Sequence, residues 1–346
     1  MFRCIELAVL AKGNVAPNPM VGSVLVHEGH IIGEGYHQQY GQAHAEVNCI
    51  NSVNDEDKYL IPQSTLYVSL EPCSHFGKTP PCCDLIIKHG IKKVIIGCRD
   101  SYEEVNGKGI EKLQQNGVEV VVGILEDDCK NLNKRFFTFH TKKRPFIILK
   151  WAATANGKIA SNTNERLLIS NDFSNRLVHK WRSEEAAILV GTKTALLDNP
   201  SLTNRLWHGK NPIRLVIDKW LGLSNSLQLF NQQQPTIIFN FIKQEIQENR
   251  TYYLLKKDVD LLEQILQACY QLHIQSILVE GGTILLQSII DKGLWDEANV
   301  ITSSNLIVDD GLNAPILSHQ TIIKKDALFS DSITYFINKN TGNKAP

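Results

Sequence analysis

A histidine and a glutamate two residues apart, with two cysteines further along, are the residues of this chain best suited to metal chemistry. His44 and Glu46 lie in the segment GQAHAEVNCI, and Cys73 and Cys82 lie in LEPCSHFGKTPPCCDLII. A neutral imidazole and two thiolates bind Zn²⁺ and leave a fourth tetrahedral position for water. A carboxylate that does not bind the metal can accept and return the proton of that water. These four residues therefore predict a zinc-dependent hydrolytic site.

The expected secondary structure brings these residues together. A helix that begins near Ala43 carries Glu46 just after His44, Cys73 follows the predicted strand STLYVSL, and Cys82 begins the next helix. Helix N-termini carry partial positive charge, which stabilises the thiolates that bind zinc. His-x-Glu followed by Pro-Cys and a second cysteine is typical of zinc nucleobase deaminases, although eight residues separate the cysteines here and two separate them in the general signature.

Two alternatives stay open on the residues alone. Cys83 could bind the metal in place of Cys82. The site could also be purely structural, with His75 as the fourth ligand, because structural zinc sites usually close the fourth position with a protein ligand. A residue two positions after Cys73 faces a substrate pocket more easily, which favours a catalytic site.

Strands and helices alternate along the whole chain, which predicts two α/β domains with mostly parallel sheets covered on both faces. The length of 346 residues also favours two cores. The first domain is predicted at 1–123, with two strands around a Glu-Gly turn in 21–35. A polar, partly helical linker spans 124–144, and a second domain spans 145–346. In that domain we expect strands near 147–153, 187–191, 213–217, 236–240, 276–280 and 297–302, and helices near 171–184, 260–272 and 282–292.

Composition limits the class of partner. Lysine plus arginine equals aspartate plus glutamate, so the chain has no global field to attract nucleic acid or a membrane surface. Eight scattered cysteines without a secretory leader predict reduced thiols and a cytoplasmic location. No apolar run reaches the roughly 20 residues that span a bilayer.

Four segments together resemble one known family, the bifunctional riboflavin-biosynthesis enzymes of the RibD type. They are APNPMVGSVLV, HAEVNCI, LEPCSHFGKTPPCCDLII and ILVGTKTALLDNPSLTNR, and the long cysteine spacing around GKTPP is highly specific. The resemblance covers nearly the whole chain. It implies a cytidine-deaminase-like three-layer α/β/α first domain with zinc on His44, Cys73 and Cys82, in preference to Cys83, and Glu46 as proton shuttle.

The resemblance also implies a substrate for the first domain, a ribosylated diaminopyrimidinone phosphate. Zinc-bound hydroxide is expected to add to the ring carbon that bears the exocyclic amine, and ammonia leaves. Asn18, His75 and Lys78 are the candidates for ring and phosphate contacts, because a phosphate dianion needs a cation or several donors.

For the second domain the resemblance implies a dihydrofolate-reductase-like fold and hydride transfer from NADPH to the ribose. Gly281-Gly282, between a predicted strand and helix, is a turn where a phosphate could meet a helix N-terminus, and no Gly-x-Gly-x-x-Gly fingerprint follows a strand. The substrate positions carried over from the family are Arg182, Leu202, Arg205 and Glu280. The cofactor positions are Ala153, Thr194, Asp198, Gly282, Thr283, Ile284, Leu285, Leu286, Gln287 and Ser288.

Two segments depart from the family pattern. Leu168-Ile169 stands where the family usually has Trp-Ile, so an aromatic contact near the cofactor is lost, and DSYEEVNGKG (100–109) replaces the usual loop near the deaminase pocket. The predicted function is deamination followed by reduction in riboflavin synthesis, by a homo-oligomer as in the family. The alternative is a deaminase whose second domain has lost reduction.

Overall fold

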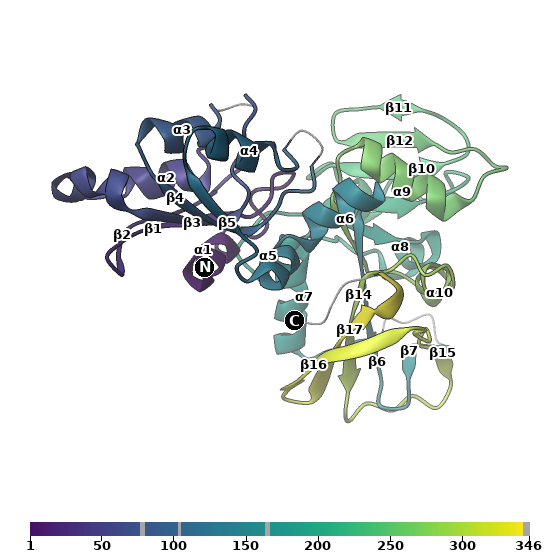
Figure 1. Ribbon diagram of the computed structural model, residues 1–346. Helices are drawn as coiled ribbons and strands as arrows, with labels where there is room; N and C mark the ends of the chain where they lie inside the picture. The colour runs from purple at the N-terminus through teal and green to yellow at the C-terminus, as the bar shows by residue number, and fades with distance from the viewer. Residues whose placement is uncertain (77–79, 103–104, 163–166, 342–346) are drawn as a thin grey trace. The chain divides into compact units, whose positions relative to one another are not determined.

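The computed structural model describes residues 1–76, 80–102, 105–162 and 167–341. They form two compact units, the first comprising 1–143 and the second beginning at Arg144 (Figure 1). Within the part of the chain described, no helix is long and apolar enough to cross a membrane.

The first unit alternates short helices with the strands of one sheet. Its elements are α1 (Phe2–Val9), β1 (Gly22–His27), β2 (His30–Tyr36), α2 (Ala45–Asn51), the 3-10 helix η1 (Asp55–Gln63), β3 (Thr65–Leu70), α3 (Cys82–Lys88), β4 (Lys93–Cys98), α4 (Lys108–Gln115), β5 (Glu119–Val122), α5 (Glu126–Leu132) and α6 (Lys134–Lys142).

The sheet of the first unit is mixed. Its strand order is β2-β1-β3-β4-β5, with antiparallel pairing of β1 to β2 and β3 and parallel pairing of β3, β4 and β5. The expectation of a mostly parallel sheet is therefore wrong at β1 and β2. Glu28 and Gly29, both at positive φ, form the two-residue turn between these strands, and such a turn joins only antiparallel strands. The predicted pair of strands around that turn is confirmed.

Helices cover both faces of this sheet, which gives three layers (Figure 1). The helices α2, α3 and α4 lie on one face, and Ile50, Ile86 and Leu113 from them pack with the strands in the larger core. On the other face α1 and α5 contact each other. Cys4 of α1 and Cys129 of α5 are buried in small apolar clusters on this face. The segment 124–144, predicted as a linker, contains α5 and α6, and nearly all of it belongs to the first unit.

The second unit is built on one large sheet. Its elements are β6 (Phe146–Ala153), β7 (Lys158–Ser161), α7 (Asp172–Glu184), β8 (Ala187–Val190), α8 (Thr192–Asp198), β9 (Ile213–Ile217), η2 (Gln228–Phe230), β10 (Thr236–Asn240), β11 (Glu245–Ile246), β12 (Arg250–Leu254), α9 (Leu261–Gln271), β13 (Ser276–Val279), α10 (Thr283–Asp291), β14 (Glu297–Ser303), β15 (Gly311–Asn313), β16 (Gln320–Leu328), β17 (Asp331–Asn338) and η3 (Lys339–Thr341).

The centre of this sheet is parallel and its two edges are antiparallel. The order is β11-β12-β10-β9-β8-β13-β6-β14-β17-β16, and every pairing from β12 to β14 is parallel. The six strands expected from sequence are all present in the parallel part. The hairpin of β16 and β17 was not predicted, because the sequence of the half-exposed β16, QTIIKKDAL, neither alternates strictly between polar and apolar residues nor contains a long apolar run.

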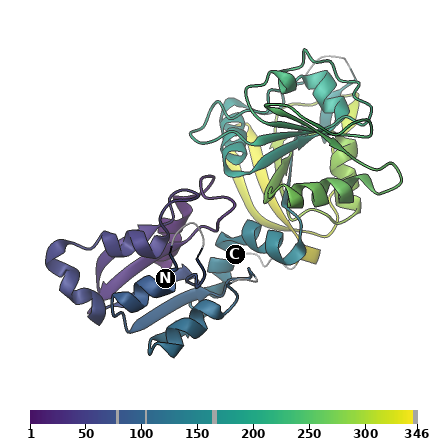
Figure 2. The ribbon, with the colours of Figure 1, turned by 90° about the horizontal axis from the view of Figure 1, so that it is seen from above.

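Side-chain alternation along the parallel strands builds a core on each face. Leu189 and Val279 face α9 and α10, whereas Ile188 and Leu278 face the opposite side, where α7 and α8 lie. Strands buried on both faces need this near-continuous apolar sequence. Figure 2 shows the strands of this unit between the helices.

Candidate active sites

One imidazole and two thiols converge in the first unit. His44, Cys73 and Cys82 form the one group of described residues that could hold a metal ion, and their ligand atoms all lie within 4.8 Å of one another. His44 Nδ1 is 3.6 Å from the Sγ of Cys73 and 3.3 Å from that of Cys82. Tetrahedral zinc with ordinary Zn–N and Zn–S bond lengths separates such atoms by about 3.6 Å. The donor set and its spacing therefore fit zinc.

Two helix N-termini and a strand end position this cluster. His44 is the extended residue directly before α2, Cys82 is the first residue of α3, and Cys73 lies shortly after β3. The backbone N–H of Cys82 donates to Cys73 Sγ over 3.3 Å. Hydrogen bonding from Cys82 lowers the pKa of the Cys73 thiol, whereas proximity to Cys73 raises the pKa of the Cys82 thiol. The pair therefore holds a thiolate readily, which is the form that binds zinc.

Glu46 lies in the first turn of α2 and is almost fully buried. Burial, followed by the neighbouring Cys73, raises the pKa of its carboxyl group above the ordinary value. A group that must accept a proton and then give it up works best when its pKa is moved toward the operating pH. Glu46 therefore lies beside the cluster with a pKa shifted in the direction that suits a proton-transfer group.

The geometry bears on both alternatives left open by the sequence, which are Cys83 in place of Cys82 and His75 as a fourth ligand. The Sγ of Cys83 contacts the carbonyl oxygens of Pro72 and Gly109 at 3.4 and 3.5 Å, and the group of possible ligands does not include it. His75 also lies outside that group, with its ring 6.4 Å from that of Tyr102. Lys78 lies outside the described residues.

Asn18 approaches the cluster through a second histidine. His37 Nδ1 is 3.0 Å from the carbonyl oxygen of Ala43, which can only accept, so this nitrogen carries the proton. Its Nε2 then accepts from the amide of Asn18 over 3.1 Å. The His37 ring packs edge-on against that of His44, with centroids 5.3 Å apart. This chain of contacts fixes which way the Asn18 amide points.

A buried carboxylate anchors the loop that follows β4. Glu71 accepts backbone N–H groups at both oxygens, from Asp100 (3.2 Å) and Gly107 (3.0 Å) at Oε2 and from Gly109 (3.0 Å) and Ile110 (3.3 Å) at Oε1. A side chain at Gly109 would collide with the carbonyl of Pro72, since its Cβ would lie 2.1 Å from that oxygen. The loop is therefore held directly against the segment that leads into Cys73.

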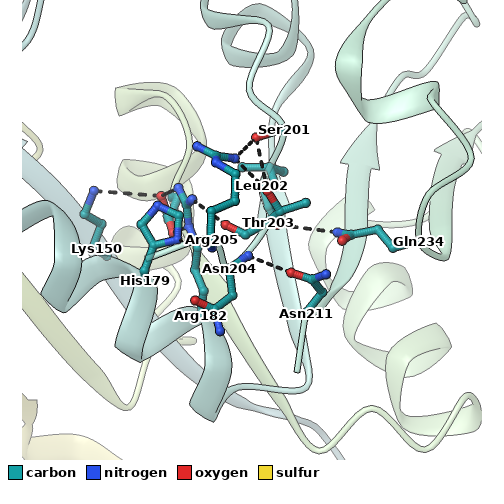
Figure 3. Close-up of polar contacts among 11 residues, drawn as sticks. Lys150, His179, Arg182, Ser201, Leu202, Thr203, Asn204, Arg205, Asn211 and Gln234 are labelled. Atoms are coloured by element: carbon teal, nitrogen blue, oxygen red, sulfur yellow. Dashed lines mark hydrogen bonds and ion pairs between the residues drawn. The ribbon is translucent and has the colours of Figure 1, made fainter. Parts of the chain in front are cut away.

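The second unit contains a buried cluster of charged side chains around Glu280, which directly follows β13. Arg182 of α7 binds this carboxylate at both oxygens, over 2.7 and 2.8 Å, and Lys150 of β6 lies 3.8 Å away (Figure 3). Burial alone would raise the pKa of Glu280, but the charges of Arg182 and Lys150 outweigh burial and lower it to about 2. Glu280 is therefore a permanent anion in a site that also holds two cations.

The loop 201–205 lies against this cluster (Figure 3). Arg182 donates to the carbonyl oxygen of Thr203 over 3.1 Å, and the backbone N–H of Arg205 donates to His179 Nδ1 over 2.8 Å. The Arg205 guanidinium contacts the hydroxyls of Thr203 and Ser201. Leu202 is buried and has a positive φ of 50°, which turns the chain between Ser201 and Thr203. The structure thus brings together the four predicted substrate residues.

The predicted cofactor turn lies where β8 and β13 end side by side. A Cβ at Gly281 would lie 2.9 Å from the Cα of Val190, and Gly282, at a φ of 43°, would place its Cβ 3.1 Å from Thr194 Oγ1. Close backbone approach explains Gly281 and the positive φ explains Gly282, whose turn brings Thr194 next to the start of α10.

The other predicted cofactor residues are in mixed environments. Leu285 and Leu286 are in the core, Ile284 and Asp198 are exposed, and Ala153 is buried at the end of β6. The remaining side chains of this segment also have partners: Thr283 bonds to Asn313, Gln287 to Asp291 and Ile316, and Ser288 to Ile284 within the same helix. Leu168 is exposed. The side chains of Leu285 and Leu286 are therefore not available to a ligand.

Sequence reasoning missed four residues at these sites. Lys150 had a visible signal, since it is the one charge in the strand FIILKWAA. Glu71 precedes the Pro-Cys pair, but nothing in the sequence shows that its acceptors are filled by a distant loop. His37 and His179 are isolated histidines whose partners are backbone or amide groups. Contacts of that kind leave no pattern in a single sequence.

Comparison with known proteins bears on both units. Residues 1–98 match the family model of the cytidine and deoxycytidylate deaminase zinc-binding region, and residues 145–315 match that of the RibD C-terminal domain. The riboflavin biosynthesis protein RibD of Aquifex aeolicus is 39% identical over 328 residues, which cover 93% of this chain and 90% of that protein. RibD of Escherichia coli is 34% identical, with 90% and 88% covered.

Solved structures agree with the sequence comparison. A crystal structure from Thermotoga maritima, described as a diaminohydroxyphosphoribosylaminopyrimidine deaminase/5-amino-6-(5-phosphoribosylamino)uracil reductase, is similar with a TM-score of 0.88 and 36% identity, covering 98% of this chain and 97% of that one. One crystal form of Acinetobacter baumannii RibD gives a TM-score of 0.84 at 27% identity, with 97% of each chain covered. The fold expected from the sequence is confirmed. The chain belongs to the RibD family and is a bifunctional enzyme, with a zinc-binding deaminase domain followed by a reductase domain.

Proposed function

We propose that the first unit deaminates 2,5-diamino-6-ribosylamino-4(3H)-pyrimidinone 5′-phosphate. The second unit then reduces the ribosyl group of the product with NADPH to give 5-amino-6-(5-phospho-D-ribitylamino)uracil. The observation that carries this proposal is the cluster of one imidazole and two thiols with a buried carboxylate beside it. The similar Thermotoga maritima protein is described as having the same two activities, deaminase and reductase.

In the first unit, His44, Cys73 and Cys82 hold zinc, which when bound supplies an activated water for attack on the ring carbon. Glu46 takes up a proton and delivers it to the departing amine, and burial raises the pKa of its carboxyl group, which favours uptake of the proton. The amide oxygen of Asn18 is left for the ring, since its nitrogen donates to His37. His75 and Lys78 are the further substrate candidates.

In the second unit, NADPH would supply a hydride when bound, and the residues that would hold it are Gly282 and Thr194, which meet at the turn before α10, together with Ala153 and Asp198. The helix α10 begins at this turn, so its free backbone N–H groups suit a phosphate. The segment 283–288 would contribute backbone groups, because its buried side chains belong to the core.

The substrate phosphate is assigned chiefly to Arg205. Arg182 already binds Glu280 at both oxygens, so its main role is to hold this carboxylate and the backbone of Thr203. Leu202 shapes the loop. Glu280 and Lys150 together present one anion and one cation to the polar groups of the ribose, which suits hydrogen bonding to sugar hydroxyls.

The partners we propose are small molecules and other copies of this chain. A net charge of zero gives no basis for tracking a nucleic-acid backbone. None of the eight cysteines is in a disulfide, and two of them are assigned to zinc, which supports a reducing compartment such as the cytoplasm.

A two-stage assay tests the proposal. The purified protein should release ammonia from the diaminopyrimidine phosphate, and with the deaminated intermediate it should consume NADPH, followed by loss of nicotinamide absorbance. Ammonia release with no NADPH consumption at any protein concentration would identify a deaminase whose second domain has lost reduction. Consumption of NADPH without ammonia release would contradict the assignment of the first unit.

A further inference from the structure

His179 has an arrangement that fixes both its tautomer and its role as an acceptor. It lies on α7 one turn before Arg182 and is almost completely buried. The backbone N–H of Arg205 points at its Nδ1 over 2.8 Å (Figure 3). A backbone N–H can only donate, so Nδ1 is unprotonated and the neutral ring carries its proton on Nε2.

The surroundings keep this ring neutral. Burial is the largest cause, and the positive charges of Arg182 and Arg205 add to it, so that the pKa of His179 falls to about 4. Lys150 acts in the same direction, whereas Glu280 acts in the opposite one. At neutral pH the lone pair on Nδ1 is therefore always available to the Arg205 N–H.

Two side chains of α7 hold the same loop at two backbone groups. Arg182 donates to the carbonyl oxygen of Thr203, and His179 accepts from the N–H of Arg205. The guanidinium of Arg205 is itself bonded to the hydroxyl of Thr203 over 2.6 Å. The direction of that guanidinium consequently depends on the backbone that His179 fixes.

We propose that His179 is a positioning residue of the reductase, which holds the backbone of Arg205 so that its guanidinium meets the substrate phosphate. This inference rests on the proposed reductase function. His179 contacts the loop and not the reacting atoms, so its effect should fall on the binding of phosphorylated substrate.

Two substitutions that introduce an amide distinguish the roles of the two ring nitrogens of His179. In His179→Asn the amide oxygen can occupy the position of Nδ1, whereas in His179→Gln the longer side chain places its amide near the position of Nε2 and leaves the Arg205 N–H without an acceptor. An unsatisfied buried N–H costs about 1–3 kcal/mol, so the loop of the free variant shifts to pair this group with water, and restoring the binding geometry lowers affinity by a factor of up to roughly 5 to 150. We expect His179→Gln to raise KM for the phosphorylated intermediate by about that factor with kcat nearly unchanged, and His179→Asn to stay within about threefold of the wild type.

The same enzyme provides controls for a general structural effect. A dephosphorylated intermediate should show the same KM with His179→Gln as with the wild type, and deamination should be unaltered because it occurs in the other unit. In an Arg205→Ala background, His179→Gln should add no further increase in KM, since the guanidinium that it positions is gone. If His179→Gln does not fold, His179→Ala takes its place in each comparison.

The outcomes distinguish this inference from the proposed function. Equal KM values for His179→Asn and His179→Gln, or an equal loss with the dephosphorylated intermediate, would overturn the positioning role while leaving the reductase intact. A wild-type protein that consumes no NADPH would overturn the proposed function. The positioning role would then be decided by calorimetric titration of the phosphorylated intermediate into the same variants, with the same rank order of affinities expected.

Discussion

At the scale of single residues, Glu46 is the side chain on which deamination should depend most. It is buried beside the cluster without belonging to the group of possible metal ligands. Glu46→Gln keeps the shape and removes the titratable group, so we expect deamination to fall by about 10² to 10⁴, the usual contribution of a general acid–base. Ammonia release measures this effect, and elemental analysis should find zinc retained.

The matched control is Glu56→Gln, at an exposed position in the same unit. It should leave deamination unchanged, and both variants should reduce the deaminated intermediate at the wild-type rate. Full deamination by Glu46→Gln would contradict the assignment of the proton shuttle.

Glu280 should make the second unit sensitive to acid. Arg182 and Lys150 outweigh the effect of burial and lower the pKa of Glu280 from an ordinary 4.5 to about 2. A lowered carboxyl pKa means that the ion pairs stabilise the fold fully above pH 4.5, and that this stabilisation is lost as the pH falls from 4.5 through 2. The shift corresponds to on the order of 3 kcal/mol.

Tryptophan fluorescence isolates this effect, because all five tryptophans belong to the second unit: Trp151, Trp181, Trp207, Trp220 and Trp295. In denaturant titrations Glu280→Gln should be less stable than the wild type by about 3–5 kcal/mol at pH 7, because two buried cations lose their anion. The difference should shrink toward zero near pH 2. A constant difference across this range would show that Glu280 does not titrate there.

A functional residue can be found from a single sequence when it forms a recognisable motif with other residues of the chain. His44, Glu46, Cys73 and Cys82 share a spacing that zinc chemistry explains, and the structure brings them together. Lys150, His179 and Glu71 act through partners that lie roughly 25 to 130 positions away in the chain. Only the fold creates those pairs, so the sequence shows at most an unusual residue, such as the one charge of Lys150 in an apolar strand, and not the partner of that residue.

At the scale of elements, the loop between β4 and α4 depends on Glu71. Its carboxylate accepts four backbone N–H groups, from Asp100, Gly107, Gly109 and Ile110. In Glu71→Gln one of the two oxygens becomes an NH₂ group that faces two donors, and hydrogen bonds to a charged group contribute about 1.5–3 kcal/mol each. Hydrogen exchange of these four amides should therefore accelerate at least about tenfold.

The control for this variant is Glu111→Gln, on the exposed side of α4. In Glu111→Gln the backbone amides of Asp100, Gly107, Gly109 and Ile110 should exchange as in the wild type. Zinc content and NADPH consumption of Glu71→Gln should be unaltered, while deamination decreases as the loop loosens. Unchanged exchange at all four amides would show that the loop is held by other contacts.

Strands were predicted correctly where their residues form a buried apolar run, and they were missed where exposed polar residues interrupt that run. The buried strands β4, β8 and β13 are short apolar runs and were located from sequence. The strands β11 and β12 at one end of the sheet and the hairpin of β16 and β17 at the other end mix polar and apolar residues. Edge strands are held by pairing with a neighbour already in place, which local sequence does not encode.

At the scale of the whole molecule, two separately packed units account for two activities in one chain. Each unit has its own sheet, its own buried clusters and its own charged site. The alternation of strands and helices and the length of the chain were enough to predict two α/β domains. The mixed direction of the first sheet was set by a two-residue turn.

Zinc content measured together with both activities tests the central claim most directly. We predict one zinc per chain in freshly purified protein, and loss of ammonia release after dialysis against a chelator, with recovery when zinc is added back. NADPH consumption with the deaminated intermediate and tryptophan fluorescence should stay unchanged throughout. Protein that contains no metal, or that still deaminates at the full rate after its zinc has been removed, would contradict the account.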